Sequence, residues 1–163
     1  MKQFNIMKKV RTIFILCLAL LLTACNLNER STYTFSIENG DSVNITFKSK
    51  DGYSISQKDG TFIISKDNKT ISQGVFLTDN VYKEYKKIIE ENKDNKILNK
   101  KSGKKDDNEY IYYETNGKSG MEYNYIVKVY STNSAVIIGC LTNKEEAQKV
   151  FEHLIIKYDF NNL

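Results

Sequence analysis

The sequence predicts an α+β fold in which an antiparallel sheet of about six to eight strands packs against two amphipathic helices. Three observations support this prediction. Short runs of alternating apolar and polar residues recur from residue 32 onward, separated by Asn, Asp and Gly. Two stretches, 79–92 and 142–158, instead repeat their apolar residues with helical spacing. An Asn-Gly pair stands between the first two alternating runs, as in a hairpin.

The first hairpin is expected over residues 33–47. Apolar residues alternate over 33–37 and again over 43–47, with Asn39-Gly40 between the two runs. A type I′ turn needs positive φ at both central residues, which Asn and Gly tolerate. We therefore expect two antiparallel strands joined at this turn.

A repeat with a period of eight residues follows, in which Lys-Asp-Gly or Lys-Asp-Asn recurs from Lys50, Lys58 and Lys66. Apolar and β-branched residues fill 53–57, 61–65 and 70–77, so the segment predicts a meander of short strands. The Asp that follows each of these lysines could bind calcium, but a calcium loop of the EF-hand type needs carboxylates two residues apart and a closing Glu. Turn chemistry is the interpretation that we favour.

A helix is expected from Asp79, as N-cap, to about Asn92, because apolar residues recur there with helical spacing. Residues 93–105 then hold six Lys and one Asp. This composition predicts an exposed loop around Ser102-Gly103.

A second hairpin is expected over 109–115 and 121–130. A five-residue loop would oppose Glu114 and Glu122, which is unfavourable, whereas a four-residue loop pairs Tyr112 with Tyr125. We favour the four-residue loop. It also pairs Tyr110 with Val127 and places the following side chains on one face: Tyr110, Tyr112, Tyr123, Tyr125, Val127 and Val129.

The chain ends with a buried-type strand over 135–141 and a helix. Thr142 and Glu145 have the spacing of a capping box, in which Thr142 caps the helix and Glu145 reaches back. The inward stripe of this helix is expected to be Ala147, Val150, Phe151, Leu154, Ile155 and Tyr158, and its outward face Glu146, Lys149, His153 and Lys157.

The charge balance argues against nucleic acid as a partner. The net charge is +4, but Lys2, Lys8, Lys9 and Arg11 account for it, so the rest of the chain is neutral. The chain has 22 Lys and only 2 Arg, whereas nucleic-acid binders favour a basic domain and Arg.

No catalytic residue, metal site or cofactor is predicted. The one imidazole, His153, is expected on the solvated face of the last helix, so no Ser or Cys has a base in reach. One His and no paired thiols leave only carboxylates for a metal. Cys140 lies in an apolar run and is expected to be a buried small hydrophobe.

The N-terminal segment is typical of a targeting signal. A basic start precedes the uncharged residues 12–24, which as a helix would span about 20 Å, too short for a bilayer core of about 30 Å. The run ends in Leu22-Thr23-Ala24-Cys25, which resembles the lipobox of bacterial lipoprotein precursors.

This resemblance implies that a peptidase cleaves between Ala24 and Cys25 and that Cys25 Sγ carries a diacylglyceryl thioether. Residues 1–24 are then a signal peptide, 25–31 a lipidated tether and 32–163 a single globular domain. The expected location is the extracytoplasmic face of the cell membrane, where a diacyl anchor gives stable attachment.

The expected globular domain also resembles the PsbP-like proteins. The resemblance rests on the order of the predicted elements, on Phe47-Lys-Ser-Lys-Asp-Gly-Tyr-Ser-Ile55 and on Phe151-Glu-His-Leu-Ile-Ile156. It implies a sandwich of an antiparallel sheet with flanking helices, and an assembly or binding role rather than catalysis.

Two surfaces are candidates for binding a partner. The tyrosines of the second hairpin, Tyr110, Tyr112, Tyr123 and Tyr125, could contact proteins or glycans, or could pack in the core. The lysines Lys100, Lys101, Lys104 and Lys105 could contact anionic lipid or the phosphates of a wall polymer, or could simply be solvated.

The predicted function is a non-catalytic binding or assembly role at the cell surface, with a surface protein or wall polymer as partner. The alternative is a self-protection lipoprotein, such as one that confers immunity to a membrane-attacking bacteriocin.

Overall fold

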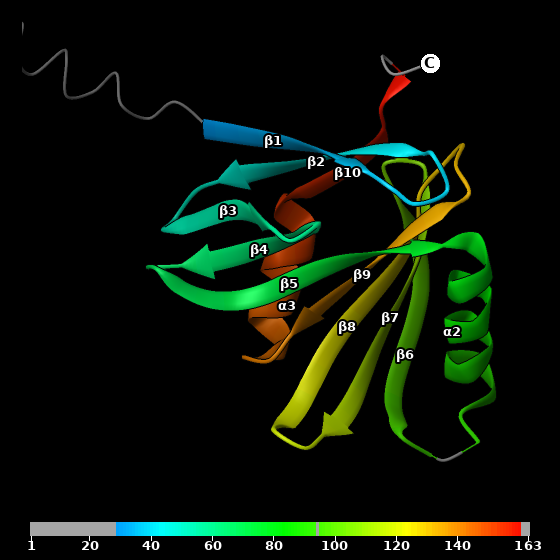
Figure 1. Ribbon diagram of the computed structural model, residues 1–163. Helices are drawn as coiled ribbons and strands as arrows, with labels where there is room; N and C mark the ends of the chain where they lie inside the picture. The colour runs from blue at the N-terminus through cyan, green and yellow to red at the C-terminus, as the bar shows by residue number, and fades with distance from the viewer. Residues whose placement is uncertain (1–28, 94, 161–163) are drawn as a thin grey trace, which may run out of the picture.

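The computed structural model describes residues 29–93 and 95–160. Within these ranges the chain forms ten strands in two antiparallel sheets, together with two helices (Figure 1). The predicted α+β fold with antiparallel strands and two helices is confirmed, and the strands outnumber the expected six to eight. The predicted signal peptide, its cleavage site and Cys25 lie outside the described residues.

The smaller sheet has the order β1-β2-β10. Its strands are β1 (Glu29–Ser36), β2 (Ser42–Ser49) and β10 (Leu154–Tyr158), so the chain's last strand joins its first hairpin. Because β1 begins at Glu29, the expected start of the folded domain at residue 32 falls inside a strand.

The first hairpin is confirmed, but its turn differs from the predicted type I′. Ile37 N donates to Asp41 O (2.8 Å) and Gly40 N donates to Ile37 O (2.9 Å), which encloses a three-residue loop. Gly40 has φ of 89°, while Asn39 is not among the residues with positive φ. A three-residue loop needs a left-handed residue only at its last position, so Gly alone meets the requirement.

The larger sheet has the order β3-β4-β5-β9-β8-β7-β6. Its strands are β3 (Tyr53–Lys58), β4 (Thr61–Lys66), β5 (Lys69–Thr78), β6 (Ile97–Lys105), β7 (Asn108–Gly117), β8 (Gly120–Lys128) and β9 (Ser134–Cys140). The predicted meander is confirmed as β3, β4 and β5. Asp51, Asp59 and Asp67 have φ between 48° and 55°, as expected of turn residues.

The lysine-rich segment was expected to be a loop, and that expectation is wrong. Residues 97–105 form β6, which pairs along β7 at the edge of the sheet. Lysine is common on edge strands, because its ammonium stays in water while the backbone pairs on one side.

The register predicted for the second hairpin is confirmed. Tyr112 pairs with Tyr125 and Tyr110 pairs with Val127. The pairing continues to Gly117 and Gly120, so only two residues, Lys118 and Ser119, remain in the loop between the strands.

The large sheet has a core on each face. On its outer face α2 (Asp79–Glu91) covers part of the sheet, and its buried Tyr82 and Ile89 pack on Ile111, Tyr113, Ile126 and Ala135. On its inner face α3 (Lys144–His153) and the small sheet close the main core. The largest fully buried side chains there include Phe47, Phe62, Ile45, Ile64 and Leu154. Cys140 belongs to this core and is buried, as predicted.

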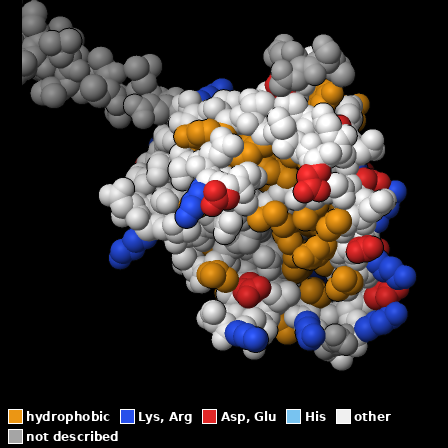
Figure 2. Space-filling model, viewed as in Figure 1, with side chains coloured by type: hydrophobic (Ala, Val, Ile, Leu, Met, Phe, Trp, Pro, Cys, Tyr) orange, Lys and Arg blue, Asp and Glu red, His pale blue; other side chains and the backbone are white. Residues whose placement is uncertain are grey.

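Part of the outer face stays open beside α2. Figure 2 shows apolar side chains gathered on this face. The exposed large apolar residues of β5 and α2 include Val75, Tyr85 and Ile88. No described helix has the length and apolar character needed to cross a membrane.

Helix α2 matches the predicted range, but Asp79 is not its N-cap. Thr78 occupies the cap position, and Asp79 lies in the first turn, where its carboxylate pairs with Lys83 (2.6 Å) and Lys128 (2.9 Å). Asn92 ends the helix in the left-handed conformation, with φ of 42°.

Helix α3 differs from its prediction at both ends. Its N-cap is Asn143, whose side chain accepts from Glu146 N (2.9 Å), so the predicted capping box of Thr142 and Glu145 is wrong. The helix ends at His153, and the predicted continuation through Leu154, Ile155 and Tyr158 is also wrong. Those residues form β10, because they complete the small sheet beside β2. Ala147, Val150 and Phe151 face the core as predicted.

Candidate functional site

A groove of about 600 Å³ lies between the edge strand β6, the β7–β8 hairpin and helix α3. It brings together the two surfaces that the sequence indicated separately. Five lysines line it, namely Lys100, Lys101, Lys104, Lys105 and Lys144. Its aromatic residues are Tyr110, Tyr112, Tyr125 and Phe151, and its remaining lining residues are Asn99, Gln148 and Glu152.

Strand register explains why lysines and tyrosines meet. Lys101 pairs with Tyr112 and Gly103 pairs with Tyr110, so alternate residues of β6 share a face with the tyrosines of β7. Gly103 makes room for its partner's ring, because a Cβ there would lie 2.6 Å from Tyr110 Oη.

Stacked aromatic rings form the floor of the groove. The Phe151 ring from α3 lies 4.0 Å from the Tyr125 ring at an interplanar angle of 11°. The Tyr110 and Tyr112 rings flank this pair, with centroids 4.9 Å from Phe151 and 5.0 Å from Tyr125 respectively. Tyr112 and Tyr125 are only 8% and 6% exposed, so their rings belong to the core.

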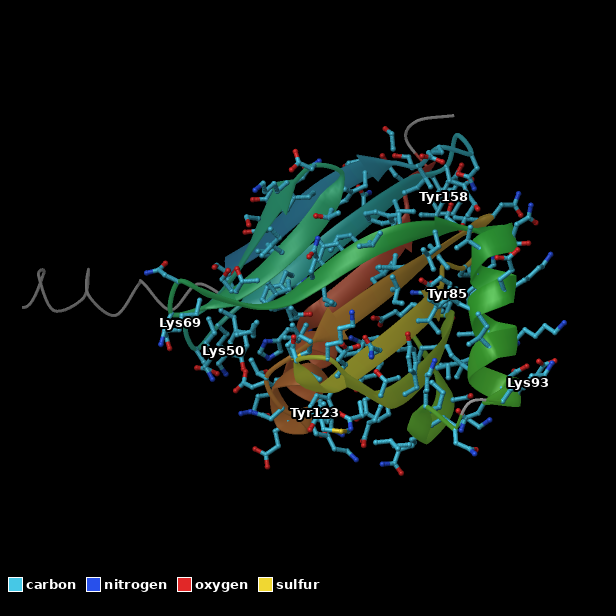
Figure 3. The ribbon with its side chains drawn as sticks, turned by 60° about the horizontal axis from the view of Figure 1, so that its bottom comes forward. Lys50, Lys69, Tyr85, Lys93, Tyr123 and Tyr158 are labelled. Carbon is cyan, nitrogen blue, oxygen red and sulfur yellow. The ribbon has the colours of Figure 1, made fainter. Side chains whose placement is uncertain are left out.

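Two tyrosine hydroxyls remain available to a ligand. Those of Tyr110 and Tyr125 form no hydrogen bond with any described residue, although both side chains line the groove. Burial raises the pKa of Tyr125 to about 12, so its phenol stays protonated and can donate. Tyr123 is half-buried, does not line the groove and lies toward the lower edge of the view in Figure 3.

Glu114 organises one end of the groove. Its side chain is buried and accepts hydrogen bonds from Tyr112 Oη (2.7 Å) and Asn99 Nδ2 (2.7 Å). It also forms an ion pair with Lys144 Nζ (2.9 Å). The bonds from Tyr112 and Asn99, with the Lys144 charge, lower the pKa of Glu114 to about 2. The carboxylate therefore stays ionised and holds the Lys144 ammonium 5.7 Å from the Tyr112 ring centroid.

Lys105 has a structural role. Its ammonium donates to the carbonyls of Phe151, Glu152 (3.1 Å) and Leu154 (2.6 Å), where α3 ends. Burial lowers its pKa, and the free carbonyls of the helix C-terminus stabilise the charge.

The other lysines of β6 are engaged to different degrees. Lys100 donates to Glu90 O (2.9 Å) at the end of α2, and Lys104 Nζ lies 3.8 Å from Glu109. Lys101 is exposed and forms no hydrogen bond or ion pair with the described residues. Lys101 is therefore the groove cation most available to a ligand.

His153 lies away from the groove and is not solvated as predicted. Its ring packs edge-on against Phe47 (5.9 Å) and Tyr53 (5.6 Å) on the small-sheet side of α3. Its Nδ1 is buried and has no hydrogen-bond partner in the described part of the chain. The prediction failed because aromatic side chains of β2 and β3 pack against this side of α3, and their contact with the helix is not visible in its own residue pattern.

Sequence reasoning missed Glu114, Lys144 and Phe151 as parts of this site. One signal was available for Glu114: it continues the alternation of Tyr110 and Tyr112, and a carboxylate on a buried face needs partners. Lys144 and Phe151 come from a distant helix, and no local pattern relates them to the hairpin. In the described ranges no group of three or more His, Cys, Asp or Glu residues could hold a metal ion.

Comparison of the chain with protein-family models, with curated proteins and with solved structures gave no significant match.

Proposed function

We propose that this protein is a non-catalytic lipoprotein of the extracytoplasmic membrane face, which binds an anionic partner in the groove beside α3. The observation that carries the proposal is the meeting of Lys101 from β6 and Lys144 from α3 with the tyrosines of β7 and β8 in one groove. The lipobox Leu22-Thr23-Ala24-Cys25 supports the anchor.

The chemistry of the groove favours binding of an anion. Ammonium groups and phenol hydroxyls donate hydrogen bonds, and Glu152 supplies the one carboxylate among the lining residues. Among the described residues that line the groove there is no imidazole or thiol to act as a base or a nucleophile. An anion held there would gain charge-assisted hydrogen bonds.

The anchor would keep the folded domain near the bilayer. Glu29, where β1 begins, is four positions after Cys25, and an extended chain of that length reaches about 14 Å. A partner at the outer membrane surface or in the adjacent wall would be within reach.

The anchor is tested by labelling cells with a radioactive fatty acid. We expect wild-type protein to carry label and to fractionate with membranes, and Cys25→Ser to lose both properties. Cys17→Ser is the matched control, because it removes a thiol from the same apolar run outside the lipobox. Equal labelling of wild type and Cys25→Ser would refute the anchor.

The binding role is tested by placing a photoreactive amino acid at position 148 in intact cells. Gln148 is exposed and lines the groove, while the adjacent Lys149 is exposed and does not. We expect an adduct from position 148 that position 149 does not form. Equal or absent adducts at both positions would refute the groove as the binding site.

A further inference from the structure

We propose that β6 accepts an extended acidic segment of a partner protein as an added strand, whose carboxylates pair with Lys101 and Lys104. This inference rests on the proposed function, since it names the partner class for the same groove. It also gives the backbone of β6 a part in binding.

Strand β6 offers one open side to a further strand. In the described ranges it pairs with β7 alone, at the end of the large sheet. At its first residue the side chain of Asn92 takes the place of a neighbouring strand: Ile97 N donates to Asn92 Oδ1 (2.8 Å), and Asn92 Nδ2 donates to Ile97 O (2.9 Å). Beyond this point residues 98–102 and Lys104 are exposed.

The direction of the backbone groups of β6 follows from the turn that joins it to β7. Lys105 pairs with Asn108, so the turn has two residues, and its closing pair is joined by backbone hydrogen bonds. Bonded and non-bonded pairs alternate along an antiparallel ladder. The N–H and C=O groups of Lys100, Ser102 and Lys104 therefore point away from β7. These groups have no backbone partner in the described part of the chain.

Cavities border this open side on both faces of the sheet. The groove lies on the α3 face. A second cavity of about 330 Å³ lies on the α2 face, between β6 and the side chains of Tyr82, Lys86 and Glu90. Side chains of an added strand would enter the two cavities alternately. Binding by strand addition has this form, because backbone bonds hold the peptide and pockets for alternate side chains give specificity.

The charges of β6 favour an acidic partner. The strand carries four lysines and no acidic residue. Lys101 faces the groove and has no ion pair with the described residues, whereas Lys104 faces α2 and pairs loosely with Glu109 (3.8 Å). The other two lysines already bind carbonyls of α2 and α3. Because Lys101 and Lys104 lie on opposite faces, two acidic side chains that reach them are three positions apart on the added strand.

The same charges argue against a second copy of the chain as the added strand. Two antiparallel β6 strands related by a two-fold axis at Ser102 would oppose Lys100 to Lys104, and an axis at Lys101 would oppose that residue to itself. Like charges directly opposite each other on neighbouring strands are destabilising. Edge lysines thus prevent self-pairing, while an acidic strand is attracted to them.

Gly103 indicates the kind of residue that lies between the two acidic ones. The Tyr110 ring lies against it, since a Cβ at position 103 would be 2.6 Å from Tyr110 Oη. A side chain opposite Gly103 on the groove face would contact this ring. We therefore expect an apolar residue at that position of the partner.

The test measures binding of end-blocked peptides to full-length protein purified from membranes in a zwitterionic detergent. The main probe is Thr-Thr-Glu-Val-Val-Glu-Thr-Thr, whose symmetric order suits either strand direction. Its matched control, Thr-Thr-Glu-Val-Glu-Val-Thr-Thr, has the same composition with both acidic side chains on one face. We expect the control to bind about threefold more weakly, because one ion pair is lost. A peptide with Lys in place of both Glu should bind at least about tenfold more weakly than the main probe.

Amide hydrogen exchange distinguishes strand addition from contact through side chains alone. Saturating main probe should slow exchange at the Ser102 and Lys104 amides at least about tenfold, because peptide carbonyls accept from them. Exchange at Lys101 and Gly103 should not change, since their N–H groups already face β7.

Two variants test the contacts from the side of the protein. Ser102→Pro removes an outward N–H, which an edge strand tolerates, and should weaken binding at least about tenfold. Ser102→Ala keeps this N–H and is its control. Lys101→Gln should weaken binding about threefold and reduce the salt dependence. Its control is Lys50→Gln, since Lys50 is exposed, does not line the groove and lies at the opposite end of the molecule from α2 (Figure 3).

Equal binding of the two glutamate peptides would overturn the assignment, as would binding without protection of the Ser102 and Lys104 amides. Unchanged binding by a Ser102→Pro protein of wild-type thermal stability would also overturn it. Protection of these amides by self-association without peptide would make a second copy the occupant. If no peptide binds while position 148 still forms its specific adduct, the partner class is wrong and the groove remains the binding site. If the adduct is also lost, the proposed function fails with it.

Discussion

Glu114 is a buried carboxylate that contributes to both stability and the site. It lies on the tyrosine face of β7, where an ionised side chain without partners would be costly. Tyr112, Asn99 and Lys144 supply its three donors, from β7, β6 and α3. Glu114 therefore joins three elements at one end of the groove.

Replacing Glu114 by Gln should lower the free energy of unfolding at about pH 7 by ~2 kcal/mol, because charge-assisted bonds become neutral ones. The folded state lowers the pKa of Glu114 from 4.5 to about 2. This stabilisation is therefore complete above about pH 4.5 and is lost as the pH falls toward 2. Urea unfolding measured across this range should show that the difference in free energy of unfolding between the wild type and Glu114→Gln decreases as the pH falls.

Glu145→Gln is the control for this prediction, since Glu145 is exposed in the first turn of α3. A stability difference between wild type and Glu114→Gln that is independent of pH would contradict the assigned role.

Helix α3 is delimited by side chains at both ends. Asn143 caps its first turn through Glu146 N, and Lys105 from β6 binds the carbonyls of its last turn. After that turn the chain continues directly into β10, so the helix has no loop in which to fray. These two contacts hold Phe151 against Tyr125 in the groove.

Asn143→Ala should destabilise the protein by about 1 kcal/mol, because Glu146 N loses its acceptor. Thr142→Ala should reduce the stability by only a few tenths of that amount. Thr142 Oγ1 contacts Cys140 Sγ (3.1 Å) and does not cap the helix. Thermal unfolding of the two variants measures the difference. If Thr142→Ala destabilises the protein more than Asn143→Ala does, the result contradicts Asn143 as the N-cap and supports the capping box predicted from the sequence.

The two sheets are connected by polar contacts as well as by the core. The loop between β1 and β2 meets the residues before β9: Asp41 Oδ2 accepts from Asn133 N (2.8 Å) and Ser134 Oγ (2.7 Å). Asn39 Nδ2 also donates to Asn133 O (3.0 Å). Ser134 is fully buried, so the bond from its hydroxyl satisfies a group that water does not reach.

Asp41→Ala should lower the free energy of unfolding by about 1–2 kcal/mol, because two donors lose a charged acceptor. Hydrogen exchange at the Asn133 amide should become faster in the variant. Glu38→Ala, an exposed position in the same loop, is the control. Unchanged exchange at Asn133 would show that the contact does not hold the sheets together.

Local patterns in the sequence were sufficient for most elements. Alternation and turn residues predicted both hairpins and the meander, and the repulsion of Glu114 and Glu122 was enough to choose the β7–β8 register. The positive φ of Asp51 and Asp59 also followed from turn chemistry. Such signals suffice because strand period and turn preference depend on neighbouring residues.

Distant contacts were decisive where the predictions failed. Residues 97–105 have the composition of a loop and pair as β6 because β7 offers an edge, and residues 154–158 continue a helical pattern yet pair with β2. The groove depends on the same contacts, since β6 brings its lysines and α3 brings Phe151 to the tyrosines. Sequence alone thus sufficed for the strands other than β6 and β10, for the hairpin register and for the lipobox hypothesis at Cys25. The groove required the folded chain, because its walls come from segments whose pairing no local pattern encodes.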